Sequence, residues 1–378
     1  MDFTNYIPFL SNRMLHLILM PTEQCNFRCV YCYEDFAAGE MPRPVVDGVK
    51  ALLARRVANL DLLSLSWFGG EPLLAWPIVE EVQSFASGLA RDHPQVRLSS
   101  NMTTNASLLT RKRFDRLLEL GVRRFQISLD GTLEAHDSTR QRRGGGGSFA
   151  AIWANLLMMR ATKEAFEALL RLHVTCENRA AVHELLSLLA EKFAGDSRFP
   201  VAFKAVRRWG GPNDAKLPVL PADNENEILD QLLVRAVELG LSHQQDVFAQ
   251  PGMLQGCYAA AVGSYVVRST GELAKCTVFL GHPNNRVGTL NPDGTVALDS
   301  EKVAGWLRGV LKDEPESLKC PSRGWADSLP RPKSDPPRLI QIGQSRPTAL
   351  PSSQRLESAA LSSAASVALP DEPSRFIG

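Results

Sequence analysis

The stretch PTEQCNFRCVYCYEDF, residues 21–36, places three cysteines on one loop directly after an apolar run. Cys25, Cys29 and Cys32 have the spacing CxxxCxxC. Three thiolates on one compact loop can bind three irons of a cubane cluster and leave the fourth iron without a protein ligand. A ferredoxin run would add a fourth cysteine, and a zinc site would need further ligands at a distance. The spacing favours an iron-sulfur cluster with one open iron over a structural zinc site or a chance cluster.

Composition narrows the class of protein. The chain has 378 residues and a formal net charge of +1, so neither nucleic acid nor an anionic membrane is an expected partner. No stretch reaches the roughly 18 apolar residues of a membrane-spanning helix, and the N-terminus shows no cleavage site of a signal peptide. Seven cysteines, an odd number, then argue for thiols as ligands or core filling, not disulfides. We expect a cytoplasmic enzyme.

Short β-rich runs alternate with longer helical patterns from about residue 15 to residue 210. This rhythm is typical of parallel strands joined by crossover helices. Six β/α units predict an α/β fold, a partial (β/α)6 TIM-like barrel, with its chemistry at the C-terminal ends of the strands. The strands are expected at 16–22, 62–69, 96–104, 123–130, 168–175 and 201–207.

The chain divides into four predicted parts. After Gln250 the sequences SYVVRSTGELAKC and VGTLNPDGTVAL predict two β-hairpins with Gly-containing turns. The segment from Pro321 onward is rich in Pro and Ser and lacks an apolar period, so we expect it to be disordered. The parts are a lead-in over 1–14, the barrel core over 15–240, a small β-hairpin domain over 241–320 and the tail over 321–378.

Polar and glycine-rich residues follow the second and third predicted strands, at the edge that β/α barrels use for chemistry. Gly69 and Gly70 allow the backbone to approach a ligand closely, and Glu71 adds an acceptor. Thr103 and Asn105 carry small hydrogen-bonding side chains, which would also suit a helix N-cap.

The fourth strand ends in another polar group. Ser128 and Asp130 stand at its end, and Arg140 follows in the next loop. A serine, a carboxylate and an arginine at one rim could bind hydroxyl and carboxylate groups through charge-assisted hydrogen bonds. His136 is expected as a solvated loop residue, and Cys176, after the fifth strand, as a buried apolar one.

The CxxxCxxC spacing with the aromatic Tyr31 before the last cysteine resembles the radical S-adenosylmethionine (SAM) superfamily. The resemblance implies that Cys25, Cys29 and Cys32 hold a 4Fe-4S cluster whose open iron binds SAM. One electron then yields a 5'-deoxyadenosyl radical that abstracts hydrogen from a substrate. Positions that match SAM contacts, notably in sulfatase-maturating relatives, are Tyr31, Gly69, Gly70, Glu71, Thr103, Asn105, Ser128, Asp130 and Arg140.

The region after residue 250 resembles the opening of a SPASM or shorter twitch extension, whose added cysteines bind auxiliary clusters. Cys257, Cys276 and Cys320 are therefore candidate ligands of an auxiliary Fe-S cluster, but they leave it one protein ligand short. The cysteine pairs of the complete motif are missing, which we interpret as a truncated, frame-shifted or degenerate C-terminus. Thr277 stands where sulfatase-maturating enzymes have an aspartate base, which disfavours formylglycine formation.

The sequence thus predicts a radical SAM peptide or protein maturase. Its implied partners are a peptide or protein substrate and an electron donor of the flavodoxin or ferredoxin type. Two alternatives stay open: a radical SAM enzyme that acts on a small molecule, and a degenerate non-catalytic scaffold.

Overall fold

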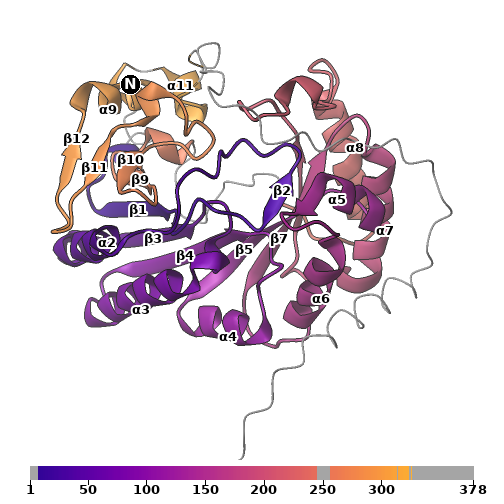
Figure 1. Cartoon of the computed structure of the whole chain (residues 1–378), viewed down its shortest axis with the longest axis horizontal. Coiled ribbons are helices and arrows are strands. Elements are labelled where there is room, and N and C mark those ends of the chain that lie inside the picture. Colours follow the sequence, from indigo (N-terminus) through magenta and orange to yellow (C-terminus); the bar gives the residue numbers. More distant parts are fainter. Residues whose placement is uncertain (1–6, 245–255, 313, 323–324, 326–378) are drawn as a thin grey trace, which may run out of the picture.

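The parallel sheet predicted from the strand-helix rhythm is present in the computed structural model, which describes residues 7–244, 256–312, 314–322 and 325 (Figure 1). Six strands pair in parallel and in chain order, so the partial barrel and its α/β class are confirmed. Each strand begins within two residues of its predicted first residue. They are β1 Met14–Leu19, β3 Leu62–Trp67, β4 Arg97–Thr104, β5 Val122–Leu129, β7 Glu167–Val174 and β8 Val201–Ala205.

Helices connect these strands and cover the outer face of the sheet (Figure 1). Pro at the first turn suits the start of a helix because its missing N–H is not needed there, and α2 and α3 both use it. The helices are α2 Arg43–Arg56, α3 Trp76–Asp92, α4 Arg111–Glu119, α5 Leu133–Thr139, α6 Phe149–Arg160, α7 Arg179–Phe193 and α8 Glu225–Glu238.

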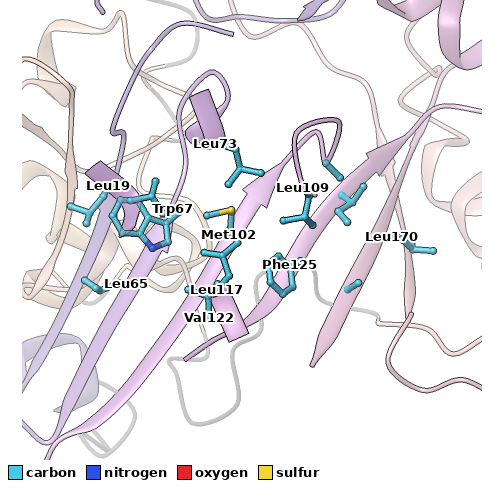
Figure 2. Close-up of a cluster of buried hydrophobic side chains, with 14 of the residues drawn as sticks. Leu19, Leu65, Trp67, Leu73, Met102, Leu109, Leu117, Val122, Phe125 and Leu170 are labelled. Carbon is cyan, nitrogen blue, oxygen red and sulfur yellow. The ribbon is translucent and has the colours of Figure 1, made fainter. Parts of the chain in front are cut away.

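The core lies between the outer face of the sheet and these helices. Side chains alternate along a strand, so Phe125, Ile127 and Leu129 of β5 are buried under the helices while the residues between them are partly exposed on the inner face. Figure 2 shows part of this cluster, in which Trp67, Met102 and Phe125 come from three neighbouring strands. The inner face is thereby left to polar side chains.

Both predicted β-hairpins are present, in the strands β9 Ser264–Val267, β10 Glu272–Ala274, β11 Gly288–Leu290 and β12 Val296–Leu298. β9 runs parallel to β1, so the hairpins extend the barrel sheet to ten strands (Figure 1, orange). The helices α9 Ser300–Trp306, α10 Arg308–Leu311 and α11 Pro315–Lys319 follow them. The division into domains at residue 241 stays a prediction.

The remaining elements are short. The helix α1 Ile7–Leu10 precedes β1, and the strands β2 Phe27–Cys29 and β6 Arg140–Arg142 form a separate two-stranded sheet. The predicted disordered tail lies outside the described residues, apart from Pro321, Ser322 and Trp325. Within the described ranges, no helix is both long and apolar enough to cross a membrane.

Candidate active site

The three cysteines of the CxxxCxxC motif lie on the loop between β1 and α2, above the C-terminal edge of the sheet. The strand β2 belongs to this loop and pairs with β6, and this pairing places Cys29 opposite Arg140. The backbone N–H of Cys32 donates to the carbonyl of Cys29 at 3.1 Å and closes a turn between them. All three side chains are free thiols, with Cys25 buried and the other two partly buried. The loop therefore holds its thiols in a fixed backbone frame.

Burial disfavours ionisation of these thiols. It raises the pKa of Cys25 to about 12 and also raises the pKa values of Cys29 and Cys32. In the part of the chain that the structure describes, no three His, Cys, Asp or Glu side chains are grouped as ligands of one metal ion. A cubane cluster differs from a single metal ion, because each of the three protein thiolates binds a separate iron. Free, sheltered thiols beside a cationic arginine fit that requirement.

Gly69 and Gly70 provide a close backbone approach to the cysteine loop, and their contact with SAM stays a prediction. Gly69 has a φ of +114°, and a Cβ there would lie 2.4 Å from the carbonyl oxygen of Thr22. A Cβ at Gly70 would lie 2.4 Å from the carbonyl oxygen of Gln24. The two glycines let the end of β3 pack against the cysteine loop.

Glu71 ties the ends of two strands together. Its buried carboxylate accepts hydrogen bonds from the Thr104 hydroxyl at 2.8 Å, the Asn105 N–H at 2.7 Å and the Leu73 N–H at 3.0 Å. Burial raises the pKa of Glu71 above its ordinary value, and these hydrogen bonds oppose that rise. The carboxylate is thus already engaged within the protein, and a contact with SAM stays a prediction.

Asn105 connects the end of β4 to the cysteine loop. Its side-chain amide donates to the Asn26 side chain at 2.8 Å and lies 3.9 Å from the sulfur of Cys25. The expected alternative, a helix N-cap, is wrong, because Thr110 caps α4 by accepting from the backbone of Arg113. Thr103 lies one strand position from Thr104, partly exposed on the inner face.

The Tyr31 hydroxyl is the centre of a buried polar network. It receives a hydrogen bond from Arg140 Nη1 at 2.6 Å and donates to Asp130 Oδ1 at 3.0 Å. His173 Nδ1 lies 3.1 Å from both the Tyr31 and the Asp130 oxygens, and Thr139 donates to the other Asp130 oxygen at 2.7 Å. The network joins the cysteine loop to strands β5 and β7.

Electrostatics keep Asp130 charged. Burial alone would raise its pKa, but the hydrogen bond from His173 and the charge of Arg140 lower that pKa well below its ordinary value. Burial is also the largest cause that lowers the pKa of His173, to about 4, so His173 is neutral near pH 7. Asp130 and Arg140 are therefore a buried pair of opposite charges beside the cysteines.

Two arginines have unused donors in this site. Arg140 Nε and Arg171 Nε are both buried and have no hydrogen-bond partner. Ser128, partly exposed on β5, lies directly opposite Arg171 of β7 in the sheet register. Buried donors without partners are costly, so these positions fit an anionic group of a bound cofactor or substrate.

Sequence reasoning missed Arg171 and His173. The signal was present in the strand sequence ALLRLHVT, where two cationic or titratable residues alternate with leucines on one face of a predicted strand. His136, expected as solvated, is wholly buried in α5, where its Nε2 lies 3.1 Å from the Ser148 hydroxyl. Cys176, expected as buried, is exposed. Both residues lie beyond the ends of predicted strands, in segments whose packing the strand pattern does not specify.

The extension brings its three cysteines near one another. The N–H of Cys257 donates to the carbonyl of Leu318 at 2.8 Å, which draws the end of α11 toward the start of the hairpins. Burial raises the pKa of Cys276 to about 12 and that of Cys257 to about 11, and the charges of neighbouring thiols, including Cys320, add to both shifts. An auxiliary cluster at this place stays a prediction.

Comparison with known proteins agrees with this geometry. Residues 19–188 match the family model of the radical SAM superfamily. This match lies within the barrel core, covers less than half of the chain, and supports the radical SAM superfamily predicted from the cysteine spacing. That superfamily implies a 4Fe-4S cluster and SAM.

Relatives by sequence match less than half of this chain. A GTP 3',8-cyclase of Acaryochloris marina is 31% identical over 47% of this chain and 53% of its own length. GTP 3',8-cyclase 2 of Mycobacterium tuberculosis is 35% identical over 32% of this chain and 33% of its own length. The matched part of the chain therefore covers at most 53% of the length of these curated relatives.

Similar solved structures cover more of the chain. The structure of anSMEcpe with bound AdoMet and a peptide has a TM-score of 0.59 and 19% identity, over 82% of this chain and 83% of that one. Streptococcus suis SuiB bound to its precursor peptide SuiA has a TM-score of 0.53 and 15% identity, over 76% of this chain and 64% of that one. At such identities the likeness establishes the fold alone.

Proposed function

We propose that this protein cleaves SAM reductively and uses the resulting 5'-deoxyadenosyl radical to abstract hydrogen from a peptide or protein. The observation that carries the substrate class is the extension over β9 to β12, which continues the barrel sheet. The match to peptide-bound anSMEcpe spans 82% of the chain, so it reaches beyond the core and into this extension.

The residues of the site have separate tasks in this proposal. Cys25, Cys29 and Cys32 bind the cluster, which supplies one electron to SAM when both are bound. Tyr31 fixes Arg140 through a 2.6 Å hydrogen bond, so the free Arg140 Nε is available to a carboxylate of SAM. Ser128 adds a hydroxyl at the same rim.

Other residues position the cysteine loop. Glu71 and Asn105 join the ends of β3 and β4 to it, and Asp130 balances the charge of Arg140. Such preorganised support limits the movement of the reacting groups. These residues are positioning residues, because the contacts they make run to the protein itself.

A small-molecule substrate is the second candidate. The specific observation in its favour is the 31% to 35% identity with GTP 3',8-cyclases. Those matches cover at most 47% of this chain, so they leave more than half of it without a counterpart in the cyclases. The peptide proposal also implies a flavodoxin or ferredoxin donor in the cytoplasm. Cys257, Cys276 and Cys320 are candidate ligands of an auxiliary cluster that lacks one protein ligand.

The first experiment is anaerobic reconstitution with iron and sulfide, followed by an iron count and an assay of 5'-deoxyadenosine with SAM and dithionite. We expect about four irons per chain from the core site, or about eight if the extension also binds a cluster. The triple variant Cys25→Ala, Cys29→Ala, Cys32→Ala should lose deoxyadenosine formation, whereas Cys176→Ala, at an exposed thiol, should retain it. Deoxyadenosine formation that survives in the triple variant would contradict the cluster assignment.

A further inference from the structure

Arg171 belongs to the inner face of the barrel sheet. Its neighbours on β7, Leu170 and Leu172, are fully buried on the outer face, so Arg171 points inward with the period of the strand. Ser128 of β5 is its direct partner in the register, and Lys204 of β8 lies one inward position further along. The inner face therefore presents positive charge between the cysteine loop and the edge strand.

The electrostatic surroundings leave this charge poorly compensated. Arg171 Nε is buried without a hydrogen-bond partner. The groups whose charges reach Arg171 are Tyr33, Tyr31, Arg140 and Asp130, and burial itself lowers the pKa of Arg171. Tyrosines are neutral near pH 7, and Arg140 repels Arg171.

Asp130 is the carboxylate that reaches Arg171, but its oxygens are already used. Oδ1 accepts from Tyr31 and lies against His173, and Oδ2 accepts from Thr139. Glu34 of the cysteine loop also has a buried oxygen, Oε2, without a hydrogen-bond partner, but Glu34 is not among the groups with the largest effect on the pKa of Arg171, and burial raises the pKa of Glu34 itself to about 8. The described surroundings thus offer Arg171 no carboxylate of its own.

Bound SAM would not correct this imbalance. Its single carboxylate is outnumbered by its ammonium and sulfonium groups, and Arg140, nearer to Cys29, already offers a free donor to that carboxylate. An arginine buried without a counter-ion is unfavourable unless a ligand supplies one. A substrate with an anionic group would supply that counter-ion directly beside Arg171.

We propose that Arg171 binds an anionic group of the substrate and so determines substrate specificity. This inference rests on the proposed function, under which the anion is the carboxylate side chain of an acidic residue next to the modified position of the peptide. A guanidinium presents paired donors to a carboxylate. A phosphate-bearing small molecule shares this chemistry and is separated from a peptide by the test.

The test uses the reconstituted, SAM-bound protein and isothermal titration calorimetry. The probes are N-acetylglutamate amide, the uncharged N-acetylglutamine amide and GTP. We expect the glutamate probe to bind more tightly than the glutamine probe. Arg171→Gln should weaken glutamate binding about tenfold or more, the loss expected for a charge-assisted hydrogen bond, and Arg171→Lys should retain part of it. Iron content, SAM affinity and melting temperature should stay as in the wild type.

Arg124→Gln is the matched control, because Arg124 lies on the same inner face but donates to Ser99 at 2.9 Å, away from the cysteines. Equal binding of both amides, or a loss of SAM affinity in Arg171→Gln without a loss of anion binding, would overturn the inference. Arg171-dependent binding of GTP alone would uphold the anion site and overturn the peptide assignment. The two proposals can therefore fail separately.

Discussion

At the scale of single residues, polar side chains near the cysteines divide into those engaged within the protein and those with free donors. Glu71 and Asp130 accept all their hydrogen bonds from the protein, whereas Arg140 and Arg171 each keep a buried Nε without a partner. The sequence placed Glu71, Asp130 and Arg140 at one rim, because strand ends of a parallel sheet meet there. The sequence could not show which of these side chains would keep an atom without a hydrogen-bond partner, because that depends on how the loops pack.

Glu71 offers a direct test of its positioning role. Glu71→Ala would leave the N–H groups of Asn105 and Leu73 and the hydroxyl of Thr104 without their acceptor. Buried donors that lose their partner cost about 1–3 kcal/mol each, and partial relaxation should limit the total to about 3 kcal/mol. Urea denaturation of the metal-free protein measures this loss.

The matched variant is Glu119→Ala, which removes an exposed carboxylate paired with Arg116 at 3.1 Å. We expect that change to alter the free energy of unfolding only slightly, because exposed ion pairs contribute little. Equal losses in both variants would refute the role assigned to Glu71.

At the scale of elements, the strands were predictable because each is a run of apolar residues followed by polar ones. All six barrel strands and both hairpins appear where the sequence placed them. The short helix α5 was not expected, and it buries His136, which the sequence had suggested to be solvated. A single turn or two of helix carries too little periodicity to be recognised without its tertiary contacts.

Two adjacent residues of β5 test the division of the sheet into an inner and an outer face. Phe125 is buried on the outer face against Phe114, with ring centroids 5.4 Å apart, and Gln126 is partly exposed on the inner face. Phe125→Ala should lower the free energy of unfolding by about 3–5 kcal/mol, whereas Gln126→Ala should change it by less than about 0.5 kcal/mol. Chemical denaturation measures both, and comparable losses would mean that the inner face is packed as a core.

At the scale of the whole molecule, the extension and the barrel share a sheet and a core. His16 N–H of β1 donates to the carbonyl of Gly263 at 2.8 Å, and the main hydrophobic cluster includes Leu17 of the barrel with Leu273 and Trp306 of the extension. The sequence predicted a second domain because its residue pattern changes from helical to β-hairpin near residue 250. It could not show that β9 would pair with β1, because pairing between distant strands leaves no local pattern.

This shared core predicts one cooperative unfolding transition for both parts. Trp67 is buried in the barrel and Trp306 in the extension, so two variants that each keep only one of the six tryptophans, at position 67 or at position 306, report on each part separately. Their fluorescence transitions in urea should have the same midpoint and should coincide with loss of the helical circular dichroism signal. Gly263→Ala should move both midpoints together, because a Cβ there would lie 2.1 Å from the carbonyl oxygen of Met14 in β1. An extension that unfolds at lower urea than the barrel would instead show that residues 241–320 form an independent domain, docked on the edge of a sheet that is stable without it.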